Sequence, residues 1–283
     1  MPAEREGQTR LDIAMVRRGL ESSRERAKAR ILAGDVLVNG KVQRRPSFLT
    51  EEDAEIVCRG EGLVYVGRGG RKLEKAVDGR FDLRGAAALD VGASTGGFTD
   101  CLLRNGAARV YAVDVGHGQL HPSLLSDPRV VNLEGTDIRD GEALGRAVPL
   151  GGIDFCAVDV SFISLTKVLP CVLPFLKQGA ALVCLIKPQF EAGRSAVGKR
   201  GVVHDAQAHR RVLESLCAFF AGLGLAAVKL EHSPIAGGDG NIEFLATLRY
   251  DKESGSRSAP AASGVSAACI ADVVAAAHRA LKG

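Results

Sequence analysis

The sequence lacks any apolar run that could cross a membrane. Its longest uncharged apolar stretch, at residues 216–228, is shorter than the roughly 20 residues that a transmembrane helix needs. No apolar stretch near the N-terminus resembles a signal peptide. Because 46% of the 283 residues are apolar, the chain can still build a sizeable core. We therefore expect a cytoplasmic globular protein that makes no membrane contact.

The sequence also lacks paired metal-binding side chains. None of its seven cysteines forms a Cys-x-x-Cys pair, and most of them lie in apolar runs. This distribution predicts buried thiols in a reducing compartment, and neither a disulfide framework nor a zinc site. His117 and His121 are four residues apart, but Gly118 and Pro122 would break the helix needed to bring them together. We predict no metal site.

Positive charge in excess is confined to the N-terminal part of the chain. Residues 1–50 carry 11 Lys and Arg against 6 Asp and Glu, whereas the whole chain has an excess of only four. Such a local excess favours a phosphate-bearing partner. A solvated basic helix face would give the same count, so charge alone leaves both interpretations open.

Residues 1–60 read as a small α+β domain. A first helix should begin near Leu11 and end at Gly19, and a second should begin at Ser22, where Ser-Ser-Arg-Glu is a capping box. Gly34 should end the second helix. Asn39–Gly40 then predicts the turn of a β-hairpin.

The second helix should present cations around an apolar face made by Ala27, Ile31 and Leu32. This segment resembles the RNA-binding domain named after small-subunit ribosomal protein S-four. The matching residues are Arg10-Leu11-Asp12, Gly19, Ser23-Arg24, Ala27, Ile31, Gly34, Val36 and Val38-Asn39-Gly40. The residues expected to contact RNA are Arg10, Arg24, Arg26, Lys28 and Arg30. A cap that packs on the larger domain is the alternative.

After a glycine-rich linker at residues 61–70, the pattern changes to alternating strands and helices up to residue 250. Candidate strands lie at residues 87–92, 109–116, 129–135, 153–160, 181–187, 225–232 and 242–250. Apolar strands that alternate with helices favour an α/β fold, with a mostly parallel seven-stranded sheet covered on both faces. In such sheets ligands bind at the carboxyl ends of the strands.

The sequence ALDVGASTGGFTD at residues 88–100 contains the end of the first of these strands and the loop after it, and it narrows the choice of ligand. A phosphate loop for ATP would end in Gly-Lys-Ser/Thr, but this loop continues as Gly-Phe-Thr. A dinucleotide loop needs a middle glycine, which Ser94 replaces. S-adenosylmethionine has no phosphate and tolerates Ser94, while Gly92, Gly96 and Gly97 would let the backbone approach its amino-acid end.

Acidic residues after the next two strands agree with this ligand. Asp114 ends the second candidate strand, where an acid commonly takes ribose hydroxyls. Asp137 follows the third and could accept from the adenine amino group. Taken alone, each acid is also typical of a helix cap or a turn.

With these residues placed, the chain resembles the TlyA family, an S-four-like domain fused to an FtsJ-like ribose methyltransferase. The motifs that carry the resemblance are GGRKLEKA, LDVGASTGGFTD, AVDVGHGQL, GTDIR, DVSFIS, LIKPQFEAG, GKRGVVHD and GNIEFL, within residues 10–249. The resemblance implies a Rossmann-like methyltransferase domain at residues 71–250. It also implies that S-adenosylmethionine is used to methylate a cytidine 2′-oxygen in 16S or 23S ribosomal RNA within ribosomal subunits. Phe98 stands where FtsJ-like relatives often carry Trp.

The resemblance further implies a catalytic set made of Lys72, Asp159, Lys187 and Glu243. Two roles stay open for Lys187. It could remove the proton of the ribose hydroxyl if burial and positive neighbours lowered its proton affinity, or it could stay charged and stabilise the developing alkoxide. The alternatives to an enzyme are an RNA-binding protein without activity and a membrane-active haemolysin.

Residues 251–283 begin with a Ser/Ala/Gly-rich stretch that is typical of a flexible linker. A terminal helix could follow, with Ile270, Val273, Val274 and Leu281 facing inward. Whether this helix docks on the domain is open from the sequence.

Overall fold

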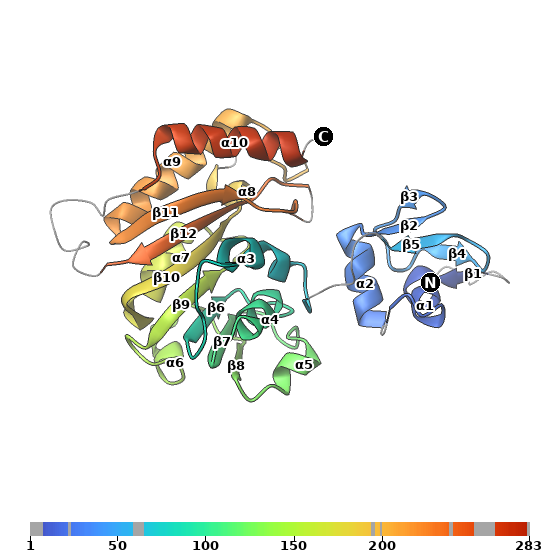
Figure 1. Cartoon of the computed structure of the whole chain (residues 1–283), viewed down its shortest axis with the longest axis horizontal. Coiled ribbons are helices and arrows are strands. Elements are labelled where there is room, and N and C mark those ends of the chain that lie inside the picture. Colours follow the sequence, from blue (N-terminus) through green and yellow to red (C-terminus); the bar gives the residue numbers. More distant parts are fainter. Residues whose placement is uncertain are drawn as a thin grey trace. The chain divides into compact units, whose positions relative to one another are not determined.

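The computed structural model describes residues 8–21, 24–58, 65–193, 196–198, 200–237, 240–251 and 264–281. Contacts divide the chain into two compact units, residues 1–68 and residues 69–283. Figure 1 labels the elements of both units. The border between the units falls within residues 61–70, where we expected a linker.

The first unit is a small α+β domain with its own apolar core. Its elements are β1 (Gln8–Arg10), α1 (Leu11–Arg17), α2 (Arg24–Ala33), β2 (Val36–Val38), β3 (Lys41–Val42), β4 (Leu49–Glu51) and β5 (Ile56–Cys58). β1 pairs with β4, and β2 lies between β3 and β5 in a second small sheet. Leu11 and Met15 of α1 pack with Ala27 and Ile31 of α2 over this sheet.

Glycines end both helices of this unit, as predicted. Gly19 has a φ of +68° and Gly34 a φ of +80°. The backbone N–H after each glycine donates to a carbonyl five residues earlier, as in the bond from Leu20 to Met15, which closes the last turn. The capping box expected at Ser22 lies outside the described residues. Leu32 is 58% exposed, so its place on the buried face was predicted wrongly.

The predicted Asn-Gly hairpin is confirmed. Asn39 and Gly40 have φ values of +50° and +76° between β2 and β3, which is the left-handed pair that a tight two-residue turn requires. The Asn39 side chain also accepts a hydrogen bond from the Glu55 backbone at 2.9 Å. Since Glu55 directly precedes β5, this bond connects the turn to the start of that strand.

The second unit contains the seven-stranded sheet, and all seven predicted strands are present. They are β6 (Ala87–Val91), β7 (Arg109–Asp114), β8 (Val130–Glu134), β9 (Ile153–Val158), β10 (Leu176–Ile186), β11 (Leu225–His232) and β12 (Phe244–Tyr250). Their order is β11-β12-β10-β9-β6-β7-β8, and β12 is antiparallel to both of its neighbours. β10 begins at Leu176, earlier than expected, because an irregularity between Leu176 and Ala181 lets the strand pass through Gly179.

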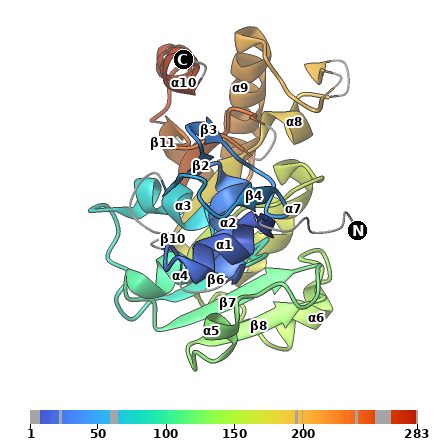
Figure 2. The same cartoon turned by 90° about the vertical axis from the view of Figure 1, so that its right-hand side faces the viewer.

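Helices cover both faces of this sheet (Figures 1 and 2). They are α3 (Gly69–Val77), α4 (Gly97–Arg104), α5 (Pro122–Leu125), α6 (Gly141–Gly145), α7 (Leu165–Val172), α8 (Pro188–Glu191), α9 (Ala206–Gly222) and α10 (Ala267–Leu281). Leu89 and Val91 of β6 join the core that α6, α7, α9 and α10 build on one face. Asp90 between them points to α4 on the other face, as the alternation of side chains along a strand requires.

The terminal helix docks on the domain. Ile270 and Val274 are buried in the main core, with Val273 and Leu281 packed against it, as predicted. His278 of α10 also forms a ring–ring hydrogen bond of 2.9 Å with the buried His209 of α9. In the part of the chain that the structure describes, no helix is both long enough and apolar enough to span a membrane.

Val274 tests how much α10 stabilises the fold. The side chain is 1% exposed, so Val274→Ala should lower the free energy of unfolding by about 1.5–3 kcal/mol through lost burial and a residual cavity. Val228→Ala is the matched control, since that valine is 53% exposed and should cost less than about 0.5 kcal/mol. Urea denaturation measures both, and equal losses would mean that docking of α10 adds nothing.

Candidate active site

The carboxyl ends of the parallel strands open into a cleft of about 460 Å³. The cleft lies where β6 sits between β7 and β9, so the chain connections run in opposite directions from this point. Side chains and loops after β6, β7, β8 and β9 line it. Of the predicted cofactor-binding residues, Gly92, Ser94, Asp114 and Asp137 line the cleft, and Gly97 and Phe98 line a smaller hollow beside it.

At Gly92 the loop after β6 lies against the backbone that directly follows β9. Its φ is +89°, and a Cβ there would lie 2.3 Å from the backbone oxygen of Asp159. Gly96, at φ +93°, is similarly restricted, since a Cβ would lie 2.1 Å from Leu124. Gly96 is the N-cap of α4, and Gly97 is its first residue. These glycines thus let the loop fold between β9 and α5, which leaves room for a ligand over its backbone.

Asp114 is held at the mouth of the cleft by two backbone donors. The N–H of Ser94 donates to one carboxylate oxygen at 2.8 Å, and the N–H of Gly116 donates to the other at 2.7 Å. Ser94 has a φ of +47°, and its hydroxyl donates to Gln119 at 3.2 Å. A carboxylate can accept further bonds at its remaining lone pairs, so Asp114 could bind a diol. Gln119 lines the same cleft and was not identified from the sequence.

Asp137 lies at the cleft and also has the hydrogen bonding of a turn residue. It lines the cleft, and it also accepts from the backbone N–H of Arg139 at 2.9 Å, as a turn residue does. The Arg139 guanidinium pairs with it at 2.6 Å, and these hydrogen bonds lower the pKa of Asp137. Arg139 also lines the cleft and went unnoticed in the sequence, because an arginine two residues after an aspartate has no distinctive signal.

Two of the four predicted catalytic residues form an ion pair at this edge. Lys187 directly follows β10, and its Nζ lies 2.6 Å from Asp159 Oδ1, just after β9. The same ammonium donates to the hydroxyl of Ser161 at 2.8 Å. Both side chains of the pair are largely buried, at 12% and 19% exposure. These contacts hold the Lys187 ammonium in one position beside the glycine loop.

The other two predicted catalytic residues form a second, more deeply buried pair. Lys72 of α3 lies 2.5 Å from Glu243, and their side chains are only 8% and 3% exposed. Ile186 and Phe244 are the last residues that pair between the antiparallel strands β10 and β12. The next residue beyond each of them is Lys187 after β10 and Glu243 before β12. The sheet therefore brings a member of each pair to the same end of neighbouring strands.

Two polar residues that the sequence did not single out hold the surrounding loops. Asn241 accepts from the Val203 backbone and donates to the Gly201 carbonyl, both at 3.0 Å, which joins the GNIEFL and GKRGVVHD motifs. Glu191 accepts from Ser164 at 2.6 Å and from the start of α7, so it fixes the segment that follows Asp159. Burial raises the pKa of Glu191.

Two phenylalanines near the loop have different surroundings. Phe98 is 3% exposed, and its ring lies close to Gly69 at the start of α3, so it packs inside the domain. Phe162 lines the cleft, is 90% exposed and has a φ of +65°, which is strained for an aromatic residue. Its ring lies 5.1 Å from that of Phe190. A strained, exposed aromatic beside a cleft is a candidate for ligand contact, and only the tertiary structure identifies it.

The cations predicted to contact RNA are not equivalent. Arg10 and Arg24 both pair with the fully buried carboxylate of Asp12 while remaining partly exposed. Arg30 is different, because it is 6% exposed and pairs with the buried Glu21 at 2.7 Å. Its expected place on an RNA-facing surface does not fit this burial. Lys28 is half-buried, and the Arg26 side chain lies outside the described residues.

The Gly92 contact yields a test with a matched control. Gly79 also has a left-handed φ, +63°, but a Cβ there would meet nothing within 4 Å. Gly79→Ala should therefore cost only backbone strain, about 1–2 kcal/mol. Gly92→Ala must also displace the end of β9. This variant should therefore lose at least about 2 kcal/mol more of its free energy of unfolding than Gly79→Ala does. Urea titrations of both variants decide this, and equal losses would mean that β9 yields without cost.

Comparison with known proteins agrees with this geometry. The FtsJ-like methyltransferase family matches residues 65–250, and the S4 domain family matches residues 9–56. The 16S/23S rRNA (cytidine-2′-O)-methyltransferase TlyA of Mycobacterium tuberculosis is 42% identical over 244 residues, which cover 85% of this chain and 89% of that protein. Hemolysin A of Brachyspira hyodysenteriae is 42% identical over 242 residues, covering 84% of this chain and 98% of that protein.

A solved structure supports the same assignment over the full length. A Streptococcus thermophilus protein that carries the name hemolysin is 40% identical and covers 98% of both chains, with a TM-score of 0.75. The FtsJ-like match alone spans more than half of the sequence, and it follows an S4 domain as the sequence motifs implied. The chain belongs to the TlyA family of FtsJ-like methyltransferases.

Proposed function

We propose that this protein transfers a methyl group from S-adenosylmethionine to the 2′-oxygen of a cytidine in ribosomal RNA of ribosomal subunits. The observation that carries the proposal is the Lys187–Asp159 ion pair, 2.6 Å long, at the carboxyl edge of the sheet beside the glycine loop. The substrate is inferred from the M. tuberculosis relative, whose name specifies this reaction on 16S and 23S rRNA. A ribosomal substrate would place the protein in the cytoplasm.

The cleft suits the proposed cofactor. Asp114 would accept from the ribose hydroxyls and Asp137 from the adenine amino group, since both carboxylates line the cleft. The backbone at Gly92, Gly96 and Gly97 would hold the amino-acid end, where the absence of side chains permits close approach. When bound, S-adenosylmethionine would supply an electrophilic methyl group on a sulfonium.

The two ion pairs have separate roles in this proposal. Asp159 and Ser161 hold the Lys187 ammonium in one position, and a charged group fixed there would stabilise the alkoxide that develops on the ribose oxygen. Because Asp159 and Ser161 hold the nitrogen of Lys187 in one place, we favour charge stabilisation over proton removal by this residue. Lys72 and Glu243 would support the site from α3 and β12 by fixing the strand end next to Lys187.

Contacts to RNA would come from both units. Residues 1–60 would supply phosphate contacts through Arg10, Arg24, Arg26 and Lys28, because the excess positive charge lies there. Phe162 would stack on a base next to the cleft, since it offers an exposed ring at the point of reaction. Retention of all four paired residues supports an enzyme over an RNA-binding protein without activity.

Lys187→Ala should leave cofactor affinity and folding nearly unchanged and lower the methylation rate by a factor of about 10² to 10⁴. Lys187→Arg should recover part of this loss if charge stabilisation is the role, and none if proton removal is, because Arg does not give up its proton. Transfer of labelled methyl groups to unmethylated subunits measures the rates. Lys167→Ala, at an exposed lysine of α7, is the control. Near-normal activity of Lys187→Ala would place the active site elsewhere.

Neutralising Lys28 tests the RNA surface. Lys28→Gln should weaken subunit binding and reduce the slope of log affinity against log salt by about 0.7–0.9, the share of one phosphate contact. Arg146→Gln is the control. This arginine belongs to the second unit, is 75% exposed and pairs with Glu142. Binding isotherms at several salt concentrations give the slopes. A slope that falls equally in both variants would argue against a specific role for the first unit.

A further inference from the structure

A fully buried carboxyl lies beneath the glycine loop and has no place in the chemistry above. Asp90 of β6 is 0% exposed and precedes Gly92 by two residues. Its neighbours across the sheet are Ala112 on β7 and Ala157 on β9, whose side chains cannot hydrogen-bond to it. Asp90 does not line the cleft, so any effect on a ligand must act through the loop or through its charge.

One oxygen of this carboxyl is committed to α4. The Thr99 hydroxyl donates to Asp90 Oδ2 at 2.6 Å, and Thr99 is the third residue of the helix, whose N-cap Gly96 provides no side-chain cap. A carboxylate near the first turn of a helix is stabilised by the exposed N–H groups there. Among the described residues Asp90 Oδ1 has no hydrogen-bond partner, although it is buried. A neutral Asn could make the Thr99 contact without the cost of burying a charge.

Opposing effects act on the pKa of Asp90. Burial raises its pKa to about 7, and the negative charges of Asp159 and Asp114 at the neighbouring strand ends add to the effect, while the Thr99 hydrogen bonds oppose it. The Cys156 thiol of β9 pairs in register with Leu89 and lies on the opposite face of the sheet from Asp90. It is neutral, because burial raises its pKa well above the usual value.

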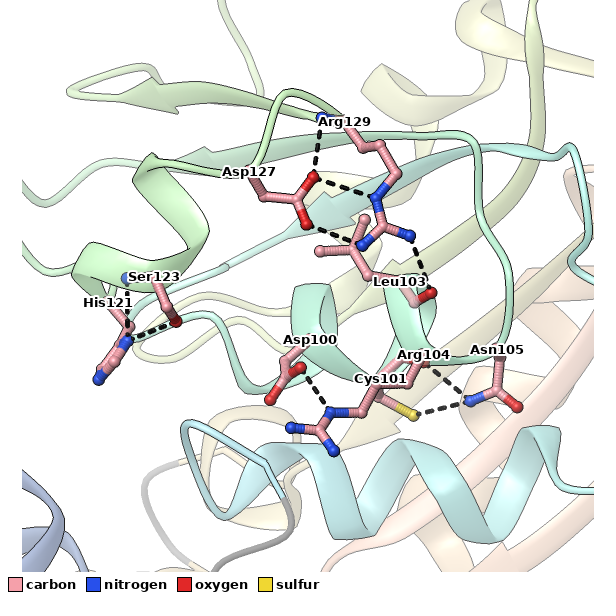
Figure 3. Close-up of polar contacts among 9 residues, drawn as sticks. All are labelled: Asp100, Cys101, Leu103, Arg104, Asn105, His121, Ser123, Asp127 and Arg129. Carbon is pink, nitrogen blue, oxygen red and sulfur yellow. Dashed lines mark hydrogen bonds and ion pairs between the residues drawn. The ribbon is translucent and has the colours of Figure 1, made fainter. Parts of the chain in front are cut away.

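The nearest ion pairs are already balanced. On α4, Asp100 is paired with Arg104, as Figure 3 shows. Asp159 is itself paired with Lys187. Asp90 is therefore the fully buried carboxyl in this group, and no cation pairs with it among the described residues.

The proposed methyl donor and its product differ by one positive charge. S-adenosylmethionine carries a sulfonium, whereas S-adenosylhomocysteine has a neutral sulfur and is otherwise nearly the same molecule. We propose that the charge of the Asp90 carboxyl, which Thr99 holds beneath the glycine loop, makes the site prefer the positively charged donor to its neutral-sulfur product. Asp90 is a positioning residue in this proposal, which rests on the proposed cofactor.

The direction with pH follows from linkage. Below pH 7 Asp90 is mostly protonated and adds no attraction for the sulfonium, and above pH 7 it is mostly ionised and does. Donor binding favours the ionised form, so donor affinity should rise with pH through this range. Product binding should change much less, because the charge that Asp90 would attract is missing. The preference for donor over product should therefore grow between pH 6 and pH 8.

Calorimetry of the full-length protein with each ligand at pH 6, 7 and 8 tests the proposal. In the wild type, the ratio of product to donor dissociation constants should rise about threefold to tenfold, since one unit of pKa coupling corresponds to a factor of ten. Asp90→Asn should flatten this rise, whereas Asp100→Asn, the control on α4, should keep it. Any titration of the ligands themselves is common to all three proteins and cancels in the comparison.

Thr99→Val gives a second reading if Asp90→Asn does not fold. Removing the hydroxyl donor should raise the pKa of Asp90, so the rise in the ratio should move to higher pH. The inference is overturned if both ligands bind and the wild-type ratio does not change with pH, or if the rise persists unchanged in Asp90→Asn or Thr99→Val. If neither ligand binds at any pH, the proposed cofactor is wrong, and the inference falls with it.

Discussion

The arrangement of the site depends on one close approach between backbones. β6 and β9 are adjacent and parallel, and the loop that leaves β6 passes directly over the end of β9. A Cβ at Gly92 would lie 2.3 Å from the Asp159 oxygen, so no other residue fits without moving a strand of the core. Because Asp159 directly follows that strand, the same contact that shapes the ligand loop also fixes a carboxylate of the site. Loop geometry and acid placement are therefore set together.

Charge pairing is the second constraint at this edge. Lys187 and Asp159 are held 2.6 Å apart, and Lys72 and Glu243 form a more buried pair nearby. An unpaired charge at the depth of the Lys72–Glu243 pair would cost several kcal/mol, so removing one partner of that pair should affect folding as well as chemistry. Asp90 differs from these four, because Thr99 donates to it and no cation pairs with it among the described residues. The four charged residues at the carboxyl edge of the sheet are thus paired, whereas the buried carboxyl of Asp90 is not.

Much of the fold could be predicted because its signals are local. The Asn39–Gly40 turn and the helix-ending Gly19 and Gly34 each depend on a left-handed φ that the chain favours at glycine and asparagine. Strand positions followed from short apolar runs, and their order of appearance sufficed to indicate a parallel sheet. The predicted catalytic residues came from motif resemblance, and the tertiary structure brings them together as two pairs, which no spacing in the sequence specifies.

The rest was decided by contacts between residues far apart in the chain. Arg30 has the helical spacing of a surface cation, yet it is buried because Glu21 at the preceding turn neutralises it. Phe162 was not singled out in the sequence beyond its place in the DVSFIS motif, yet it projects at the cleft with a strained backbone. Sequence by itself determined the elements and the glycine loop, since these follow from backbone preference and periodicity. Only the tertiary structure decided which charges are paired and which side chains face the cleft, because burial and pairing depend on what the fold brings alongside each residue.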